Sequence, residues 1–442
     1  MTYRFDGTVV TLPVDTDLAV SAPVAVESVA VEPAAAHPGD VATVAVDLVN
    51  RTDDERSGSV QVAGPDGWQE VEIPFALAAG ASDRSTVEVT VPYTVTAGNV
   101  VLTAVIGSSD EERGEASLAI GLTSAPAVVV DHVDLGLSAS ERSHGLTASE
   151  HSGTSDEAGL SRRYTHTSFP GGWFEFDVTV PVGEPFVVRA VETFDGARAK
   201  TYDVSADGVT VLEQRYVRTD GGTGTMTYQF LVDDADITAD GTVRLRFQDV
   251  DGGYDPSIAD VWILPVATGL DAAQNVLAGT AVTARTSLQA APGWGTANLV
   301  DGKRESLAGG AKGYTSNPPD RSQAGVDQWI GFDLGASKAL NTVVLYPRTA
   351  TADDTAGDGT DGAHFPKSFA LQVSDDGTTW ATVQTVTGQA DPGPRPQTYR
   401  FDTTQARYLR VQVSELGRPT VEEGRIGYYR LQLAEVQAFE LG

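Results

Sequence analysis

The sequence contains no cysteine, although it is 442 residues long. Disulfide bonds, thiol nucleophiles and thiolate metal sites are therefore excluded. Basic residues are also scarce, because 30 Lys and Arg face 61 Asp and Glu, for a formal net charge of −31. Phosphate binding needs a basic surface, so nucleic acids and anionic membranes are not expected partners.

Long apolar runs are missing as well. No stretch of about 18 apolar residues occurs, so we expect no insertion into a membrane. The first residues, Met1 to Asp6, lead straight into a strand pattern and show no signal peptide. We therefore expect a monomeric fragment of a longer exported protein, extracellular or at the cell surface, whose leader and catalytic domain lie upstream.

Helical periodicity is absent, whereas short alternating runs of apolar and polar residues recur along the chain. They are bounded by Asp-Gly, Gly-Gly and Pro turns, which is typical of β-sandwiches. The length indicates about three domains, and a hydrophobic fraction of 41% is enough for packed cores. The sequence thus predicts an all-β protein built from three tandem β-sandwich domains.

The strand patterns divide the chain into three units, after residues 1–26, which we expect to be remnant strands of a preceding domain. The first unit, 27–123, contains the alternating run "VATVAVDLVN". In the second unit, 127–266, "GGWFEFDVTVPV" and "TVRLRFQDV" place Phe176 and Phe247 on an inward face and Arg246 outward. The third unit covers 273–442.

Each unit has motifs that resemble those of a known family. In the first, the turn "GPDGW" (64–68) and the strand spacing resemble the immunoglobulin-like NEW3 domain attached to bacterial glycosidases. The second resembles an accessory β-sandwich of bacterial β-L-arabinofuranosidase-like hydrolases, on the residues Ser140, Glu141, His144 and Gly171 to Phe174.

Seven motifs follow one another in the third unit: "LVDGK", "GYTSNP", "WIGFDLG", "VVLYPR", "FPKSFALQVSDDGTTW", "ARYLRVQV" and "RLQLAEVQAFE". Together they resemble the discoidin or coagulation-factor 5/8 C-type domain, the group that includes family 32 carbohydrate-binding modules. The three resemblances imply an Ig-like sandwich followed by two jelly-roll, galactose-binding-like sandwiches.

A cation site is predicted in the third unit. Alternation in the last strand puts Glu435 on the same face as Leu433, and a buried carboxylate is costly unless it is paired. Asp301 supplies a second acid in a Val-Asp-Gly turn, and oxygen ligands favour calcium, in a structural role. The resemblance implies Asp301 and Glu435 as ligands, with backbone oxygens around Asn298 and Ala434. Two alternatives are a bulge that turns Glu435 to solvent and an ion pair with Arg304.

A ligand surface is predicted from loop residues of the same unit. A sugar needs an aromatic face for its C–H surface and planar hydrogen-bonding groups for its hydroxyls. The alternative is that Phe365 and Tyr346 are core residues and that Arg348 bonds the acidic loop 353–361. The candidate ligand-binding residues are Tyr314, Asn317, Arg348, His364, Phe365, Tyr428 and Tyr429, flanked by Ser316 and Arg430.

No catalytic motif is present. A glycosidase needs two carboxylates about 5–10 Å apart, and sequence spacing selects no such pair. The Gly-x-Ser-x-Gly, His-Glu-x-x-His and phosphate-loop patterns are missing. We therefore predict a non-catalytic carbohydrate-binding and spacer region of a secreted bacterial glycoside hydrolase, with a neutral oligo- or polysaccharide as its ligand. Alternatives are purely architectural or surface-attachment sandwiches, and an unrecognised glycosidase activity in 127–266.

Overall fold

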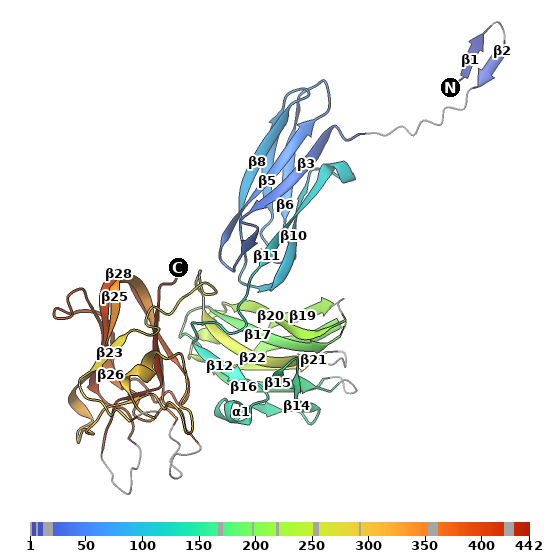
Figure 1. Ribbon diagram of the computed structural model, residues 1–442. Coiled ribbons are helices and arrows are strands. Elements are labelled where there is room, and N and C mark those ends of the chain that lie inside the picture. Colours follow the sequence, from blue (N-terminus) through green and yellow to red (C-terminus); the bar gives the residue numbers. More distant parts are fainter. Residues whose placement is uncertain are drawn as a thin grey trace. The chain divides into compact units, whose positions relative to one another are not determined.

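A computed structural model of the chain describes residues 2–5, 8–11, 21–166, 171–196, 199–217, 221–250, 256–290, 293–351, 361–419 and 428–442. Helices in these ranges are limited to α1 (Ser138–Ser143), α2 (Ala235–Thr238) and two 3-10 turns, and the rest of the regular structure is strand (Figure 1). The prediction of an all-β protein made of sandwiches is confirmed. No helix in the described part of the chain is long and apolar enough to cross a membrane.

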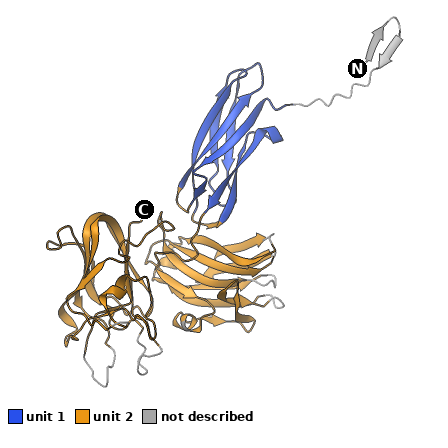
Figure 2. Cartoon of the chain, in the orientation of Figure 1, with its two compact units in different colours: residues 1–36, 41–92, 98–120 blue, residues 37–40, 93–97, 121–442 orange. Residues whose placement is uncertain are grey.

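Two compact units make up the chain (Figure 2). Unit 1 comprises residues 1–36, 41–92 and 98–120, and unit 2 comprises residues 37–40, 93–97 and 121–442. The predicted second and third sandwiches therefore lie within one unit. Their boundaries at 127–266 and 273–442, and the origin of residues 1–26 in a preceding domain, stay predictions.

Unit 1 is a sandwich of two antiparallel sheets with one parallel edge pair. Its elements are β1 (Thr2–Phe5), β2 (Thr8–Thr11), β3 (Val24–Glu32), β4 (Ala35–Ala36), β5 (Val41–Asn50), β6 (Arg56–Ala63), β7 (Val71–Leu77), β8 (Ser82–Thr90), β10 (Gly98–Val105), η1 (Asp110–Glu112) and β11 (Arg113–Ile120). One sheet has the order β3-β5-β8 and the other β4-β11-β10-β6-β7, while β1 and β2 form a separate hairpin. Val44, Val46 and Leu48 alternate along β5 and are fully buried, so the period-2 pattern of this strand supplies the core.

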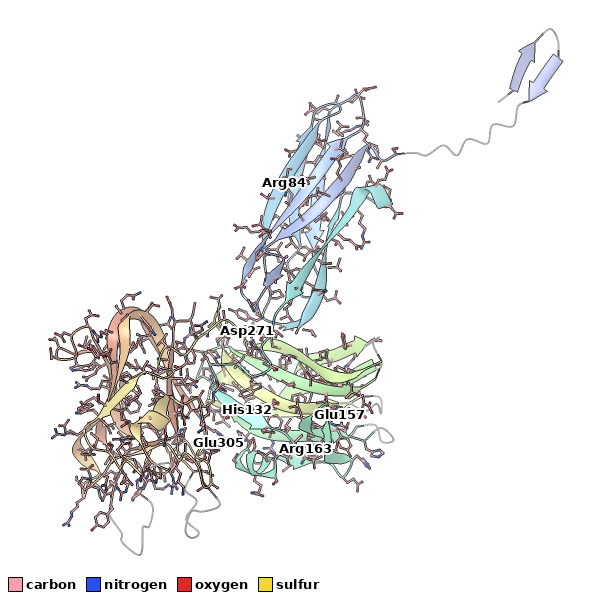
Figure 3. The ribbon with its side chains drawn as sticks, in the orientation of Figure 1. Arg84, His132, Glu157, Arg163, Asp271 and Glu305 are labelled. Atoms are coloured by element: carbon pink, nitrogen blue, oxygen red, sulfur yellow. The ribbon has the colours of Figure 1, made fainter. Side chains whose placement is uncertain are left out.

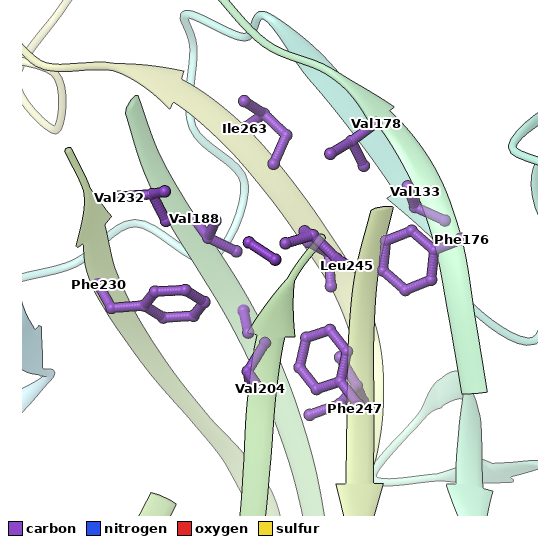
Figure 4. Close-up of a cluster of buried hydrophobic side chains, with 14 of the residues drawn as sticks. Val133, Phe176, Val178, Val188, Val204, Phe230, Val232, Leu245, Phe247 and Ile263 are labelled. Atoms are coloured by element: carbon purple, nitrogen blue, oxygen red, sulfur yellow. The ribbon is translucent and has the colours of Figure 1, made fainter. Parts of the chain in front are cut away.

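The second sandwich begins unit 2. Its elements are β9 (Val95–Thr96), β12 (Asp131–Asp134), α1, β13 (Thr147–Ala148), β14 (Ser152–Glu157), β15 (Leu160–Thr165), β16 (Trp173–Thr179), β17 (Phe186–Asp195), β18 (Ala199–Ala206), β19 (Val209–Val217), β20 (Thr223–Val232), α2, β21 (Thr242–Asp249) and β22 (Ser257–Pro265). A sheet of order β14-β15-β22-β17-β20-β9, with β12 beside β22, faces a second sheet of order β13-β16-β21-β18-β19. Phe176, Leu245 and Phe247 project into the core between them (Figure 4).

The third sandwich completes unit 2. Its elements are β23 (Ala281–Ala284), η2 (Thr296–Val300), β24 (Tyr314–Thr315), β25 (Ala324–Tyr346), β26 (Ser368–Ser374), β27 (Ala381–Val386), β28 (Gln397–Glu415), β29 (Gln432–Leu433) and β30 (Glu435–Phe439). The main sheet has the order β23-β25-β28-β26-β27, with β30 beside β25, and β24 pairs with β29. The long strand β25 shifts register against β28 at three places, and irregularities of this kind bend a strand locally.

The second and third sandwiches share an apolar core of their own. Val129, Val187 and Leu264 from the second pack in one buried cluster with residues of the third, including Tyr346 and Phe439. Polar contacts surround this cluster. The Arg395 guanidinium donates to the Thr179 hydroxyl at 2.7 Å, and the Thr398 hydroxyl donates to the carbonyl of Val129 at 2.7 Å.

A buried arginine fixes the segments that lead into and out of the second sandwich. Arg189 on β17 is fully buried and pairs with Asp271, which is labelled in Figure 3, through Nη1–Oδ1 and Nη2–Oδ2 distances of 2.5 and 3.0 Å. Its Nε and Nη2 also donate to Gln229 Oε1, and its Nη1 also donates to the carbonyl of Thr123. Asp271 Oδ1 also accepts from the backbone N–H of Thr123 at 2.7 Å. The segments around residues 123 and 271 are therefore held to the same strand.

Candidate functional site

Arg348 is placed by the end of β25 and by an indole from a distant loop. It follows Tyr346-Pro347 directly, is 6% exposed, and its guanidinium lies 5.6 Å from the centroid of the Trp294 ring. Its carbonyl accepts from the N–H of Gly362 at 2.9 Å, which brings the far end of the next loop back to the same place. A guanidinium stacked on an aromatic ring keeps its donors in a fixed plane. Residues 352–360 of the acidic loop lie outside the described residues, so the alternative partner of Arg348 there stays a prediction.

His364 is held at the same end of the sandwich by three backbone contacts. Its N–H donates to the carbonyl of Arg418, its carbonyl accepts from the N–H of Gln432, and its Nδ1 accepts from the N–H of Arg430 at 3.3 Å. An accepting Nδ1 places the proton of the neutral ring on Nε2. His364 is 1% exposed and has a φ of 65°, a left-handed conformation that a non-glycine residue adopts only when its surroundings enforce it.

Arg430 connects His364 to the loop before β25. Its Nη1 donates to the carbonyl of Ser316 at 2.9 Å and lies 3.4 Å from Asn317 Oδ1. The Asn317 side chain is exposed, whereas Tyr428 and Tyr429 are half-buried. Two backbone hydrogen bonds between Tyr429 and Asp320 fix this stretch of chain. The structure thus gathers Trp294, Asn317, Arg348, His364 and Arg430, which we call the loop-end cluster.

Two of the predicted ligand-binding residues are instead part of the core. Tyr314 is fully buried, because it opens β24, which pairs with β29 at Leu433, and its hydroxyl donates to the carbonyl of Thr286 at 2.5 Å. Burial raises the pKa of this phenol far above its usual value. Phe365 is 2% exposed and packs in the core cluster of the third sandwich. The prediction that these two rings stack on a ligand is therefore wrong, and Tyr346 is likewise a core residue at 3% exposure.

Trp294 is the residue of the cluster that sequence reasoning missed. It stands between two glycines in the run Gly293-Trp294-Gly295, which has no strand alternation around it. A large ring flanked by glycines is a signal for a residue held at a surface turn. Its contact with Arg348 joins positions 54 residues apart, and no local pattern reports such a contact. Trp294 also lines a surface hollow of about 470 Å³ together with Gln289 and Lys303.

The chemistry available at the loop-end cluster is that of a shallow binding surface. An indole, a planar guanidinium stacked on it and an exposed amide can together meet the apolar and hydroxyl-bearing parts of a sugar. The imidazole of His364, at 1% exposure, is as buried as the ring of Phe365 and can only position its neighbours. Asn317, Arg348, Tyr428 and Tyr429 remain candidates for this surface, with Trp294 and Arg430 added, whereas His364 is a buried positioning residue.

Glu435 lies fully buried at the start of β30, opposite Tyr346 on β25. Its Oε1 accepts from the N–H of Gly302 at 3.1 Å, whereas Oε2 has no hydrogen-bond partner. Burial, with a smaller contribution from the charge of Asp301, raises the pKa of Glu435 to about 8. A buried carboxylate oxygen without a partner is costly, so this site favours either a proton or a cation.

Neither alternative predicted for Glu435 matches its surroundings. The side chain is not turned to solvent, and Arg304 donates to the carbonyls of Pro126 and Ala127 and stacks 5.7 Å from the Tyr346 ring centroid. No ion pair between Arg304 and Glu435 occurs in the described structure. Glu435 therefore has an uncompensated charge whenever it is ionised in the cation-free protein.

The other predicted cation ligands are nearby but engaged in different ways. Asp301 accepts from the N–H of Lys303 and lies 3.4 Å from its Nζ. The Asn298 amide donates to two backbone carbonyls, and Ala434 is buried beside Glu435. No group of three or more His, Cys, Asp or Glu side chains suited to a metal occurs among the residues described. A cation here would rely on two carboxylates and backbone oxygens, a donor set that suits calcium.

Two family models match the chain. Residues 281–424 match the F5/8 type C domain, and residues 36–108 match the NPCBM-associated, NEW3 domain of alpha-galactosidase. The likeness of the first unit to a NEW3 domain and of the third unit to an F5/8 type C domain, predicted from their motifs, is thereby confirmed. The resemblance of 127–266 to an accessory sandwich of β-L-arabinofuranosidase-like hydrolases stays a prediction. No curated protein matches the chain at the significance required.

Similar solved structures include single carbohydrate-binding modules. Chitosan-binding module 1 from a chitosanase/glucanase of Paenibacillus sp. IK-5 is 26% identical with a TM-score of 0.27, and the match covers 38% of this chain and 99% of that one. The module CpGH89CBM32-5 from Clostridium perfringens, in complex with GalNAc-beta-1,3-galactose, is 20% identical with a TM-score of 0.26, over 37% and 96% of the two chains. CBM32-3 from a family 31 glycoside hydrolase of Clostridium perfringens is 18% identical with a TM-score of 0.29, over 38% and 94%.

Proposed function

We propose that the chain is a non-catalytic carbohydrate-binding and spacer region of a secreted bacterial glycoside hydrolase, located outside the cell. Its F5/8 type C domain binds a neutral oligo- or polysaccharide at the loop-end cluster. The observations that carry this proposal are the stacking of Arg348 on Trp294 and the contacts that link His364, Arg430 and the exposed Asn317, the two being joined by the hydrogen bond from the Gly362 N–H to the Arg348 carbonyl. Such a surface offers preorganised donors and one ring, and the net charge of −31 disfavours acidic polysaccharides.

Binding at this surface is expected to be weak. One partly exposed ring and a few hydrogen bonds correspond to millimolar to high-micromolar affinity, about −4 to −6 kcal/mol. Several modules in one enzyme would raise the effective affinity for a polymer that carries many copies of the ligand.

Replacing Arg348 should weaken binding while the fold is retained. Arg348→Ala removes hydrogen bonds from a charged group, so we expect a loss of about 1.5–3 kcal/mol. Titrations of galacto- and arabino-oligosaccharides into the full chain, followed by calorimetry or NMR, measure the effect. Because Arg348 is only 6% exposed, melting temperatures are recorded in parallel. The variant Arg348→Lys keeps the positive charge but removes the planar guanidinium, so it tests whether the geometry of the donors matters for binding.

The matched control is Arg407→Ala, since Arg407 pairs with Asp333 outside the loop-end cluster. Its affinity should equal that of the wild type. Equal affinity of the wild type and both Arg348 variants would place the binding site elsewhere on the chain. A lack of binding across a broad panel of neutral glycans would favour a purely architectural role, for which the apolar core shared by the second and third sandwiches is the supporting observation.

We also propose that calcium binds at Asp301 and Glu435, with backbone oxygens around Asn298 and Ala434, in a structural role. The supporting observation is the buried Oε2 of Glu435, which has no hydrogen-bond partner. A bound divalent cation would supply the compensating charge that this carboxylate lacks, and would hold the 301–304 turn against β30.

A further inference from the structure

The second sandwich turns one face of its sheet β13-β16-β21-β18-β19 away from the core, and this face is polar. Residues directly opposite one another in an antiparallel pair share a face. One row across the strands reads Trp173, Gln248, Asp203 and Glu213, and the next reads Glu175, Arg246, Ser205 and Thr210. The alternate residues, such as Phe176, Leu245 and Phe247, are buried in the core. The two rows therefore form a grid of polar side chains on a rigid sheet.

A hollow of about 710 Å³ lies over this grid. Asp203, Ser205, Thr210, Arg246 and Gln248 line it, together with Val250 and three further residues of the adjoining turns and strand end. Its volume falls in the range of small-ligand sites. All these lining residues belong to strands of one sheet or to the turns next to them, so the hollow is built into the fold of a single sandwich.

Arg246 is immobilised in the floor of the hollow. Its guanidinium lies 4.2 Å from the centroid of the Trp173 ring, its Nε donates to Gln248 Oε1 at 3.1 Å, and its Nη1 lies 3.4 Å from Glu175 Oε2. A guanidinium held on three sides presents its other donors in a fixed direction. A ligand that hydrogen-bonds to it does not have to order a flexible side chain.

Several hydrogen-bonding groups around Arg246 remain available. The hydroxyls of Ser205 and Thr210 and the amide nitrogen of Gln248 form no hydrogen bond within the described part of the chain. Asp203 is engaged through Oδ1, which accepts from Arg215 Nη2 at 2.6 Å. The charges of Arg246 and Asp203 are thus compensated by neighbouring side chains, while the hydroxyls and the amide nitrogen remain free to bind a ligand. Val250, 46% exposed, adds an apolar edge.

We propose that this hollow is a second saccharide-binding site, specific for a neutral sugar. An ionic ligand is disfavoured because Arg246 and Asp203 already have partners of opposite charge. A peptide segment is disfavoured because the floor offers polar side chains and no apolar pocket for an anchoring residue. A neutral polyhydroxylated ligand matches closely spaced donors and acceptors beside a small apolar edge.

The test uses the full chain with Arg348→Ala, so that binding at the loop-end cluster is weakened, and the residues whose NMR signals shift identify the site that is occupied. Galacto-, arabino-, xylo- and gluco-oligosaccharides are titrated and followed by NMR. At least one of them should bind saturably, with shifts at Ser205, Thr210 and Gln248. Ser205→Tyr fills the hollow and should reduce that affinity at least tenfold, and Gln248→Ala should reduce it severalfold.

The matched control is Thr242→Tyr, because Thr242 is exposed on the same strand as Arg246 but outside the hollow. It should bind as the parent does, and similar melting temperatures of the two tyrosine variants show that the sheet is intact. The inference is overturned if none of the four oligosaccharide classes binds the Arg348→Ala chain, or if Ser205→Tyr and Gln248→Ala leave the affinity unchanged. Loss of binding at the loop-end cluster alone leaves this second site unaffected, so the two proposals fail separately.

Discussion

In the presence of a chelator, the wild-type chain should lose stability as the pH rises from about 5 to about 9, and Glu435→Gln should lose much less. The pKa of Glu435 is raised from 4.5 to about 8 in the folded protein, so the folded state keeps a proton that the unfolded state releases. Between these values the unfolded state binds fewer protons, and the free energy of unfolding falls with rising pH. The contribution is fully present below about 4.5 and is lost above about 8. Its size is at most about 5 kcal/mol.

Calcium should reverse this loss. A cation at Asp301 and Glu435 binds the ionised carboxylate, so it should raise the melting temperature most at neutral and alkaline pH. At a calcium concentration of 100 times the dissociation constant, the stabilisation is about 2.7 kcal/mol. Thermal unfolding with calcium and with chelator, at several pH values, measures both effects in the wild type and in Glu435→Gln.

The variant Asp301→Ala distinguishes the effect of calcium binding on stability from the effect of Glu435 protonation. It should abolish the response to calcium but keep the decline with pH in chelator, because Glu435 remains buried. Asp333→Ala is the control, since Asp333 is an acid of the same sandwich that pairs with Arg407. Identical melting midpoints with calcium and chelator, together with an unchanged Asp301→Ala variant, would rule out the cation site. A pH dependence equal in the wild type and Glu435→Gln would contradict the protonation argument.

Asp271→Ala should be among the most destabilising single substitutions in unit 2. It leaves the fully buried Arg189 without its carboxylate partner, and breaking a buried ion pair in this way costs about 3–5 kcal/mol. The loss should appear as a lower urea midpoint of unfolding. Arg189→Met combined with Asp271→Ala should recover much of it, because the uncompensated charge is then gone.

Asp203→Ala is the matched control for this experiment. Asp203 pairs with Arg215 through a distance of 2.6 Å, but both side chains are more than a third exposed. Exposed pairs contribute less than about 1 kcal/mol. If Asp271→Ala and Asp203→Ala shift the midpoint equally, the buried pair does not have the role assigned to it.

Strand alternation was enough to predict the cores of the sandwiches. Phe176 and Phe247 point inward and Arg246 outward, as the period of 2 requires. The same rule put Glu435 on a buried face, and its exposure is 0%. These positions lie in strands of five residues or more, where each residue's neighbours define the face.

The burial and contacts of residues at and near the loop-end cluster could not be predicted from strand alternation. Tyr314 lies in a two-residue strand, and Phe365 follows a residue with positive φ, so neither has an alternating pattern around it. Their burial depends on partners far along the chain, such as Leu433 for Tyr314. The contact between Arg348 and Trp294 depends on the same long-range folding. Residue type identified the chemistry of this surface, whereas tertiary packing decided which side chains reach it.

The contacts of Tyr346, Phe439 and Leu441 with the second sandwich bear on how such regions are inherited and engineered. A gene rearrangement that moved residues 273–442 to another enzyme without residues 127–266 would carry an uncovered apolar patch, and exposed patches of this kind promote aggregation. Recombination that keeps the two sandwiches together avoids this penalty. The transferable module in this chain is therefore the second and third sandwiches together. Dividing the chain near residue 270 would separate two sandwiches that pack against each other through a common apolar core.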